Sequence, residues 1–155
     1  MRKIVRWILI SAGVLLIGMQ LIRPDMTNPP VDAEMAADRF LVIEPEVGAL
    51  LRTACYDCHS NETRWPWYSH VAPASWLVVR DVNEGRKRLN FSSWGEYGVA
   101  RRVLALEGIA EEVAEGSMPF PPYLLLHPEA RLDSTERARI IGWAHRESDR
   151  LGSAE

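Results

Sequence analysis

Cysteine is scarce in this chain, with only two cysteines among its 155 residues. Both lie in one pentapeptide, Cys55-Tyr56-Asp57-Cys58-His59. No cysteine is therefore left over for a structural disulfide elsewhere. The chemistry of the thiols is concentrated at this single place in the sequence.

Positive charge is also in short supply over most of the chain. Residues 25–155 hold 14 basic and 21 acidic residues. An acidic domain of this kind argues against binding to the phosphates of nucleic acid. Residues 1–24 are the reverse, with four basic residues and no acidic one.

Alternating apolar and polar residues, the pattern of a half-buried strand, are absent, and so are internal repeats. Helical spacing predicts helices over residues 46–54, 76–88, 99–113 and 133–150. Ser75 is a candidate N-cap of the second, Gly116 is placed to end the third, and Asp133 with Glu136 forms a capping box for the fourth. Four prolines make residues 118–128 irregular. The expected fold class is all-α, with long loops.

What is present is a C-x-x-C-H motif, the attachment signature of c-type haem. Cys55 and Cys58 are spaced so that each thiol can form a thioether to a haem vinyl group. His59 then stands close enough to the porphyrin to bind iron axially. We predict one covalently attached haem c, with His59 as the proximal ligand.

Two other interpretations of the motif are open. C-x-x-C also serves thiol–disulfide oxidoreductases, but these have a strand–helix context that is missing around Cys55. A zinc site needs about four ligands, usually including a second closely spaced pair. The remaining histidines, His70, His127 and His145, are isolated in the sequence.

The sixth position of the iron decides what the haem can do. Met118 is the leading candidate, because it follows a helix end at Gly116 and precedes Pro119. The other methionines all lie before residue 36. His127 is the main alternative, His70 is another, and an open site is the last. The second N–H of His59 needs a fixed acceptor, for which we expect the loop around Pro73.

The N-terminal segment has the sequence pattern of a membrane anchor. Trp7 to Ile22 is a run of 16 uncharged residues preceded by three basic ones. The run ends in bulky residues rather than in a small-x-small cleavage site. We therefore expect an uncleaved transmembrane signal-anchor in a bacterial inner membrane, with a cytoplasmic N-terminus and a periplasmic haem domain.

Three parts of the chain follow from these patterns. Residues 1–23 form the anchor, residues 24–39 an extended tether rich in proline, and residues 40–150 the haem-binding domain. That domain is expected to be a small, cytochrome c-like helical fold. Its two long loops supply candidate haem-pocket or propionate contacts: Arg64, Trp65, Trp67, Tyr68 and Tyr123.

The stretch from Cys55 to Tyr68 resembles the family known as the haem-binding domain. So do the segments Val82–Arg86, Leu89–Trp94, Met118–Pro119 with Tyr123, and His127–Pro128, together with Asn28–Asp32 near the N-terminus. The resemblance implies covalent haem and names no reaction. With the Gly-x-Met-Pro loop, which is similar to the ligand loop of small class I cytochromes c, it favours a monohaem cytochrome that transfers single electrons between redox partner proteins. That makes it an electron carrier rather than an enzyme. The alternative is a haem-based sensor or peroxidase-like enzyme with an open or displaceable distal site.

Overall fold

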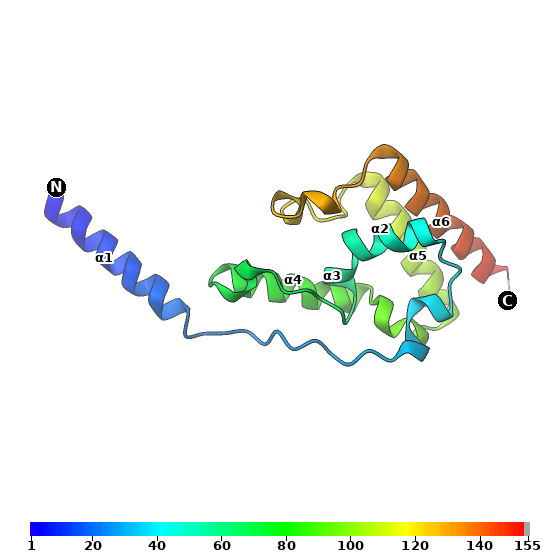
Figure 1. The fold of residues 1–155 in the computed structure, drawn as a ribbon, viewed down its shortest axis with the longest axis horizontal. Helices are drawn as coiled ribbons and strands as arrows, with labels where there is room; N and C mark the ends of the chain where they lie inside the picture. Colours follow the sequence, from blue (N-terminus) through cyan, green and yellow to red (C-terminus); the bar gives the residue numbers. More distant parts are fainter. Residues whose placement is uncertain (154–155) are drawn as a thin grey trace.

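The computed structural model describes residues 1–153, and within them every regular element is a helix (Figure 1). The α-helices are α1 (Arg2–Met19), α2 (Pro45–Ala54), α3 (Tyr56–His59), α4 (Ala74–Arg88), α5 (Val99–Glu115) and α6 (Ser134–Gly152). Short 3₁₀ helices lie at Ala33–Met35, Ala37–Arg39, Trp67–His70, Phe91–Glu96, Tyr123–Leu125 and Pro128–Ala130. The expected all-α class is confirmed for this part of the chain.

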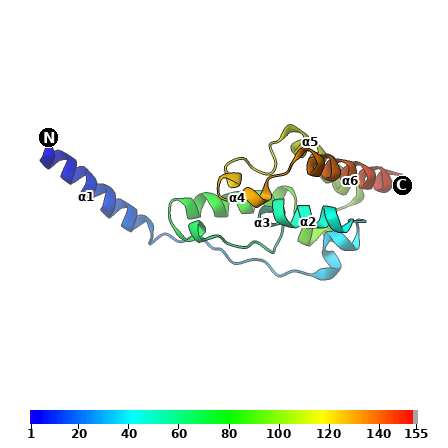
Figure 2. The same ribbon diagram turned by 45° about the horizontal axis from the view of Figure 1, so that its top comes forward.

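Helices α5 and α6 pack side by side and carry much of the core (Figures 1 and 2). Helix α5 ends at Gly116, whose φ of 76° lies in the left-handed region, which glycine adopts readily because it has no Cβ. Helix α6 begins with the predicted capping box, in which Asp133 and Glu136 exchange hydrogen bonds. Arg137 of α6 donates to the carbonyl of Val113 at 2.9 Å, which satisfies one of the free carbonyls at the C-terminus of α5.

The core is closed on the other side by α2 and the segment before it. Trp94 and Trp143 are completely buried. The indole N–H of Trp143 donates to the carbonyl of Val42 at 2.9 Å, and buried Glu147 accepts from the Val42 amide at 3.0 Å. These bonds attach α6 to the chain just ahead of α2. They fix the direction in which α2 leads into the cysteine motif.

Helix α4 lies across the motif, and its start differs from the sequence prediction. Pro73 occupies the N-cap position, and Ser75 lies inside the helix, buried, without capping it. Near its other end α4 touches the motif backbone. A Cβ placed on Gly85 would lie 2.6 Å from the carbonyl oxygen of Cys58. Only a glycine allows this close approach.

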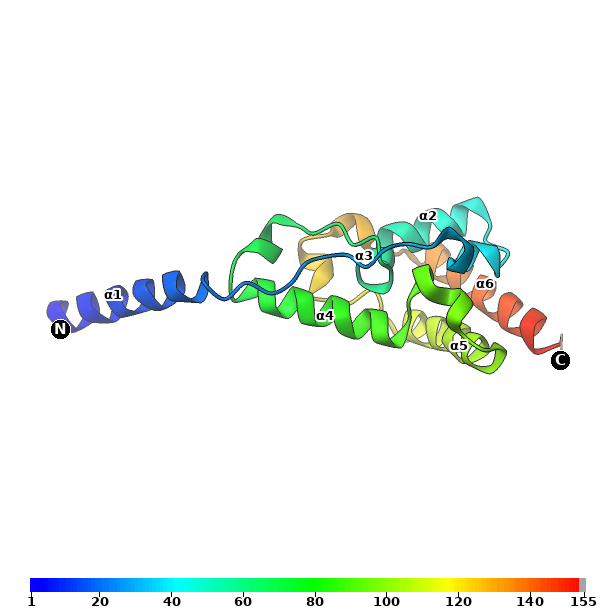
Figure 3. The same ribbon diagram turned by 90° about the horizontal axis from the view of Figure 1, so that it is seen from below.

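The residues after α1 form an extended strap, residues 20–32, that lies along the domain (Figure 3). Gln20 exchanges two hydrogen bonds with the backbone of Ala72, at 2.9 and 3.1 Å. Asn28 donates to the carbonyl of Thr63 at 2.8 Å and accepts from Arg86 at 2.7 Å. The strap overlaps the expected tether but is hydrogen-bonded to the domain along its length.

Helix α1 projects away from the domain, and none of its residues is buried (Figure 2). The structure contradicts the expected anchor, because no helix in residues 1–153 has the length and apolar character needed to cross a bilayer. Helix α1 has 18 residues, and Arg2, Lys3 and Arg6 lie within them. At about 1.5 Å per residue, its uncharged part is shorter than the ~30 Å hydrocarbon core. The predicted single-pass location in the inner membrane, with a periplasmic haem domain, rested on that span and is corrected with it.

Candidate functional site

The cysteine motif consists of a sharp turn at Cys55 and the single-turn helix α3 that follows it. Helix α2 ends at Ala54, Cys55 leaves helical geometry with φ −124° and ψ −37°, and α3 follows at once. The carbonyl of Cys55 accepts from the amides of Cys58 and His59 at 3.1 and 2.9 Å. Tyr56 stacks on Phe91 of the core, with ring centroids 5.0 Å apart. The motif is therefore held by backbone hydrogen bonds and by the Tyr56 ring rather than by the cysteine thiols.

Both cysteines are free thiols. Burial, reinforced by the neighbouring thiol, raises the pKa of Cys55 to about 12. Burial also raises the pKa of Cys58 to about 11, with Asp57 adding to the effect. Thiol–disulfide enzymes lower the pKa of the attacking cysteine. The environment here does the opposite, so it disfavours that interpretation of the motif.

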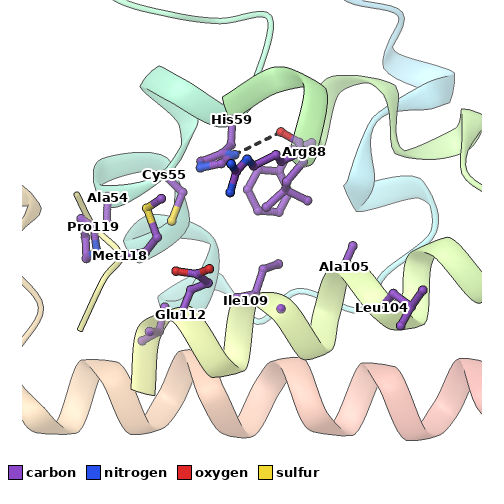
Figure 4. Close-up of a pocket in the computed structure, with 14 residues that line it drawn as sticks. Ala54, Cys55, His59, Arg88, Leu104, Ala105, Ile109, Glu112, Met118 and Pro119 are labelled. Atoms are coloured by element: carbon purple, nitrogen blue, oxygen red, sulfur yellow. Dashed lines mark hydrogen bonds between the residues drawn. The ribbon is translucent and has the colours of Figure 1, made fainter. Parts of the chain in front are cut away.

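His59 is oriented by backbone carbonyls at the end of α4. Its Nδ1 lies 3.1 Å from the carbonyl oxygens of both Gly85 and Leu89, and Figure 4 draws the bond to Leu89 as a dashed line. Burial lowers the pKa of the imidazole and favours its neutral form. A neutral ring that donates from Nδ1 keeps the lone pair of Nε2 free for a metal. The expected acceptor near Pro73 is not used, and Pro73 instead starts the helix whose far end supplies both carbonyls.

Three adjoining cavities surround the motif. The first, of about 220 Å³, lies between α3 and α5; the second, of about 250 Å³, adjoins it at His59 and Met118; and the third, of about 360 Å³, continues along α4 from Cys58. Cys55 lines the first cavity and Cys58 the other two. Together they form one mainly apolar cleft with both thiols on its wall.

The floor of the first cavity tests whether a haem fits. Ala105 and Gly108 of α5 line this cavity, and a Cβ added to Gly108 would meet no atom within 4 Å. Small residues on a helix face leave a flat, apolar surface against which a planar ring can lie. The thiols, the neutral imidazole and this floor suit a haem. Within residues 1–153 no group of three or more His, Cys, Asp or Glu side chains could hold a metal ion by itself.

Met118 lies on the wall of the first and second cavities, as His59 does. Its amide donates to the carbonyl of Glu112 at 3.1 Å, directly after the left-handed turn at Gly116. Figure 4 shows its sulfur on the same side of the first cavity as the sulfur of Cys55. The structure thus brings Met118 and the motif together around one space.

The predicted pocket residues separate into two groups. Arg64, Tyr68 and Tyr123 line the third cavity, and Tyr123 also lines the second. Trp67 is 73% exposed and lies outside the cavity walls. Trp65 is also outside them, and its buried indole N–H has no hydrogen-bond partner among residues 1–153.

His127 is occupied on both ring nitrogens. Its Nε2 lies 2.8 Å from the hydroxyl of Tyr68, and its Nδ1 lies 2.9 Å from a carboxylate oxygen of Glu129. It lines none of the three cavities. His70 is exposed and lies beside the strap, away from the cleft. This arrangement favours Met118 over either histidine as the sixth ligand.

Arg88 and Glu112 are charged cavity residues that the sequence analysis did not predict. Arg88 lines the first and second cavities, and within residues 1–153 it makes no ion pair. A basic residue at the end of a helix carries no sequence signal that separates a cavity position from a solvated one. Glu112 lines the first cavity, one helical turn beyond Gly108. That spacing along α5 was the available signal.

A family model described as haem-binding domain matches residues 14–146. The match covers most of the chain, including the motif, the three cavities and Met118. No curated protein and no solved structure shows a significant match. The chain belongs to the haem-binding domain family, as its sequence resemblance indicated.

Proposed function

We propose that this member of the haem-binding domain family is a monohaem c-type cytochrome that transfers one electron at a time between redox partner proteins. The observation that carries the proposal is His59. Its Nδ1 is fixed on the Gly85 and Leu89 carbonyls, and its ring lines a cavity that also receives Cys55 and Met118. Haem iron supplies the reversible exchange of one electron between its ferric and ferrous states.

Each residue of the site has a defined part in this proposal. Cys55 and Cys58 would hold the haem covalently through thioethers, by redox-neutral addition of each S–H to one vinyl group. His59 would supply its Nε2 lone pair to the iron. Met118 would supply its thioether sulfur, and a methionine–histidine pair raises the reduction potential.

The apolar walls have a separate part. With a haem filling the cleft, they would leave less room for water around it, and charge there would be less screened than in bulk water. Arg88 is the cationic group of the first two cavities and Glu112 is an anionic one. Arg88 is therefore a candidate to pair with a haem propionate.

A second candidate function is a haem-based sensor or peroxidase-like enzyme. One observation favours it: the Glu112 side chain lines the cavity next to Met118, where a carboxylate can move a proton. This function requires Met118 to be absent from the iron or easily displaced. The two candidates therefore differ in the strength of Met118 ligation.

The test uses the full chain expressed with cytochrome c maturation machinery. For the electron carrier, the ferric protein is low-spin, shows a methionine–iron charge-transfer band and binds CO slowly when reduced. Met118→Ala removes the band and speeds CO binding. A wild type without the band, with rapid CO binding, favours the sensor or enzyme. An unchanged spectrum in Met118→Ala removes Met118 from the site.

A further inference from the structure

The loop that carries Met118 has little burial of its own. Between Pro119 and Ala130, both buried, no residue is buried, and Leu125 is 76% exposed. A segment with so few apolar contacts is held mainly by hydrogen bonds and local turns. The position of the loop beyond Pro119 must therefore be set by specific polar contacts.

One such contact joins the loop to the cysteine motif. The Tyr123 hydroxyl donates to Oδ2 of Asp57 at 3.0 Å, across 66 residues of sequence. Asp57 lies between Cys55 and Cys58, and Tyr123 lies five residues beyond Met118. We infer that Tyr123 is a positioning residue for Met118, holding the ligand loop against the haem-attachment motif through Asp57. The inference rests on the proposed function, since it assigns a role in iron ligation.

Asp57 is well suited to receive this bond. Its side chain is 15% exposed, and its Oδ1 accepts from the backbone amide of Arg64 at 3.1 Å. The guanidinium Nε of Arg64 lies 3.5 Å from the same oxygen. Oδ1 is thereby engaged, which leaves Oδ2 pointing to Tyr123. Hydrogen bonds to an ionised carboxylate are stronger than those between neutral groups.

The ring of Tyr123 is fixed as well as its hydroxyl. It stacks on His127 with centroids 4.0 Å apart and planes 8° apart. His127 is held between the Tyr68 hydroxyl and Glu129. The loop therefore cannot move away from the motif and the Trp67–His70 segment without breaking the bond from Tyr123 to Asp57 or the bond between His127 and Tyr68.

The experiment measures how easily imidazole replaces Met118 in the ferric holoprotein. In Tyr123→Phe the stack remains and only the hydroxyl is lost. Hydrogen bonds to charged groups contribute about 1.5–3 kcal/mol, so we expect imidazole to bind about tenfold or more tightly than to wild type. The methionine–iron band should disappear at correspondingly lower imidazole concentration.

Arg150→Met is the control. Arg150 donates to the carbonyl of Phe40 at 2.8 Å near the C-terminal end of α6, away from the Met118 loop. This variant should lose stability with no change in imidazole affinity. Equal shifts in the two variants would overturn the inference, because general destabilisation would then explain both. So would a Tyr123→Phe protein with wild-type affinity.

Substitutions of Asp57 test whether Tyr123 acts on Met118 through this carboxylate. In Asp57→Ala the acceptor is gone, so adding Tyr123→Phe should change imidazole affinity no further. Asp57→Asn keeps an amide oxygen that can accept from Tyr123, so it should shift the affinity less than Asp57→Ala. A full Tyr123→Phe effect in the Asp57→Ala background would contradict the assigned route. A wild type with no methionine–iron band would instead refute the proposed function.

Discussion

The two sides of the cleft are built differently. On the His59 side, the motif turns against α4 so closely that Gly85 cannot carry a Cβ, and the imidazole meets two carbonyls. On the Met118 side, the ligand leads into an exposed, proline-rich loop attached by a few side-chain hydrogen bonds. The position of the proposed proximal ligand His59 is therefore set by packing of the fold, whereas that of the proposed distal ligand Met118 is set by contacts that one substitution can remove.

The largest expected effect comes from removing the thiols. The double variant Cys55→Ser and Cys58→Ser cannot form thioethers, so haem should no longer remain attached to the chain after denaturation. Intact mass measured under denaturing conditions checks this. Met118→Ala is the comparison from the other side of the cleft, and it should keep the haem-linked mass in full.

The proximal packing is tested next by a pair of glycine substitutions. In Gly85→Ala the new Cβ meets the Cys58 carbonyl oxygen, and overpacking of this kind costs about 1–3 kcal/mol. Gly108→Ala enters open space in the middle of α5, where replacing glycine gains about 0.5–1 kcal/mol in the haem-free chain. Urea denaturation of the two variants should therefore give changes of opposite sign.

The same pair separates folding from haem binding. The added methyl of Gly108→Ala projects from the floor of the first cavity, so this more stable chain should yield less holoprotein than wild type. Equal or higher haem incorporation in Gly108→Ala would show that the floor of α5 does not face the ring.

A smaller effect is expected at Arg137, which links α6 to the helix end before Met118. Arg137→Met removes the bond to the Val113 carbonyl and should lower the free energy of unfolding by about 1 kcal/mol. Because the turn at Gly116 leads directly to Met118, the methionine–iron band should also weaken on mild heating. A loss of stability with a band as heat-resistant as that of wild type would separate this helix end from the ligand.

The smallest effect on the site is expected at the start of α6, where the N-cap residue Asp133 lines none of the three cavities. Asp133→Ala removes the N-cap of α6, a change that typically costs about 1 kcal/mol. Thermal unfolding should shift down, while the haem spectrum and imidazole affinity stay those of wild type. A spectral change here would mean that the two sides of the cleft are less independent of the helical core than the contacts indicate.

Local patterns were sufficient to predict several parts of the fold. The capping box at Asp133, the left-handed end at Gly116 and the helix before Cys55 all depend on residues close in sequence. The motif likewise identified haem as the ligand, because the spacing of its two cysteines matches the two vinyl groups of a haem. The prediction of Ser75 as the N-cap was wrong, because the N-cap of α4 is Pro73, two residues earlier.

The rest depended on contacts between distant segments. The carbonyls that hold His59 come from the end of α4, 26 and 30 residues away, and backbone acceptors leave no signal in side-chain patterns. The bond between Tyr123 and Asp57 spans 66 residues. The prolines of the strap predict an extended segment, but they give no signal of the hydrogen bond between Asn28 and Arg86. The prediction of a membrane anchor was wrong because three basic residues lie inside α1, which leaves its uncharged part too short to cross a bilayer.

The most direct test of the central claim is the mass of the full-length protein, expressed with cytochrome c maturation machinery and measured under denaturing conditions. The account predicts the mass of the chain plus one haem, with a peptide containing Cys55 and Cys58 carrying the addition. A chain of unmodified mass, whose haem is extracted by acid and organic solvent, would contradict it.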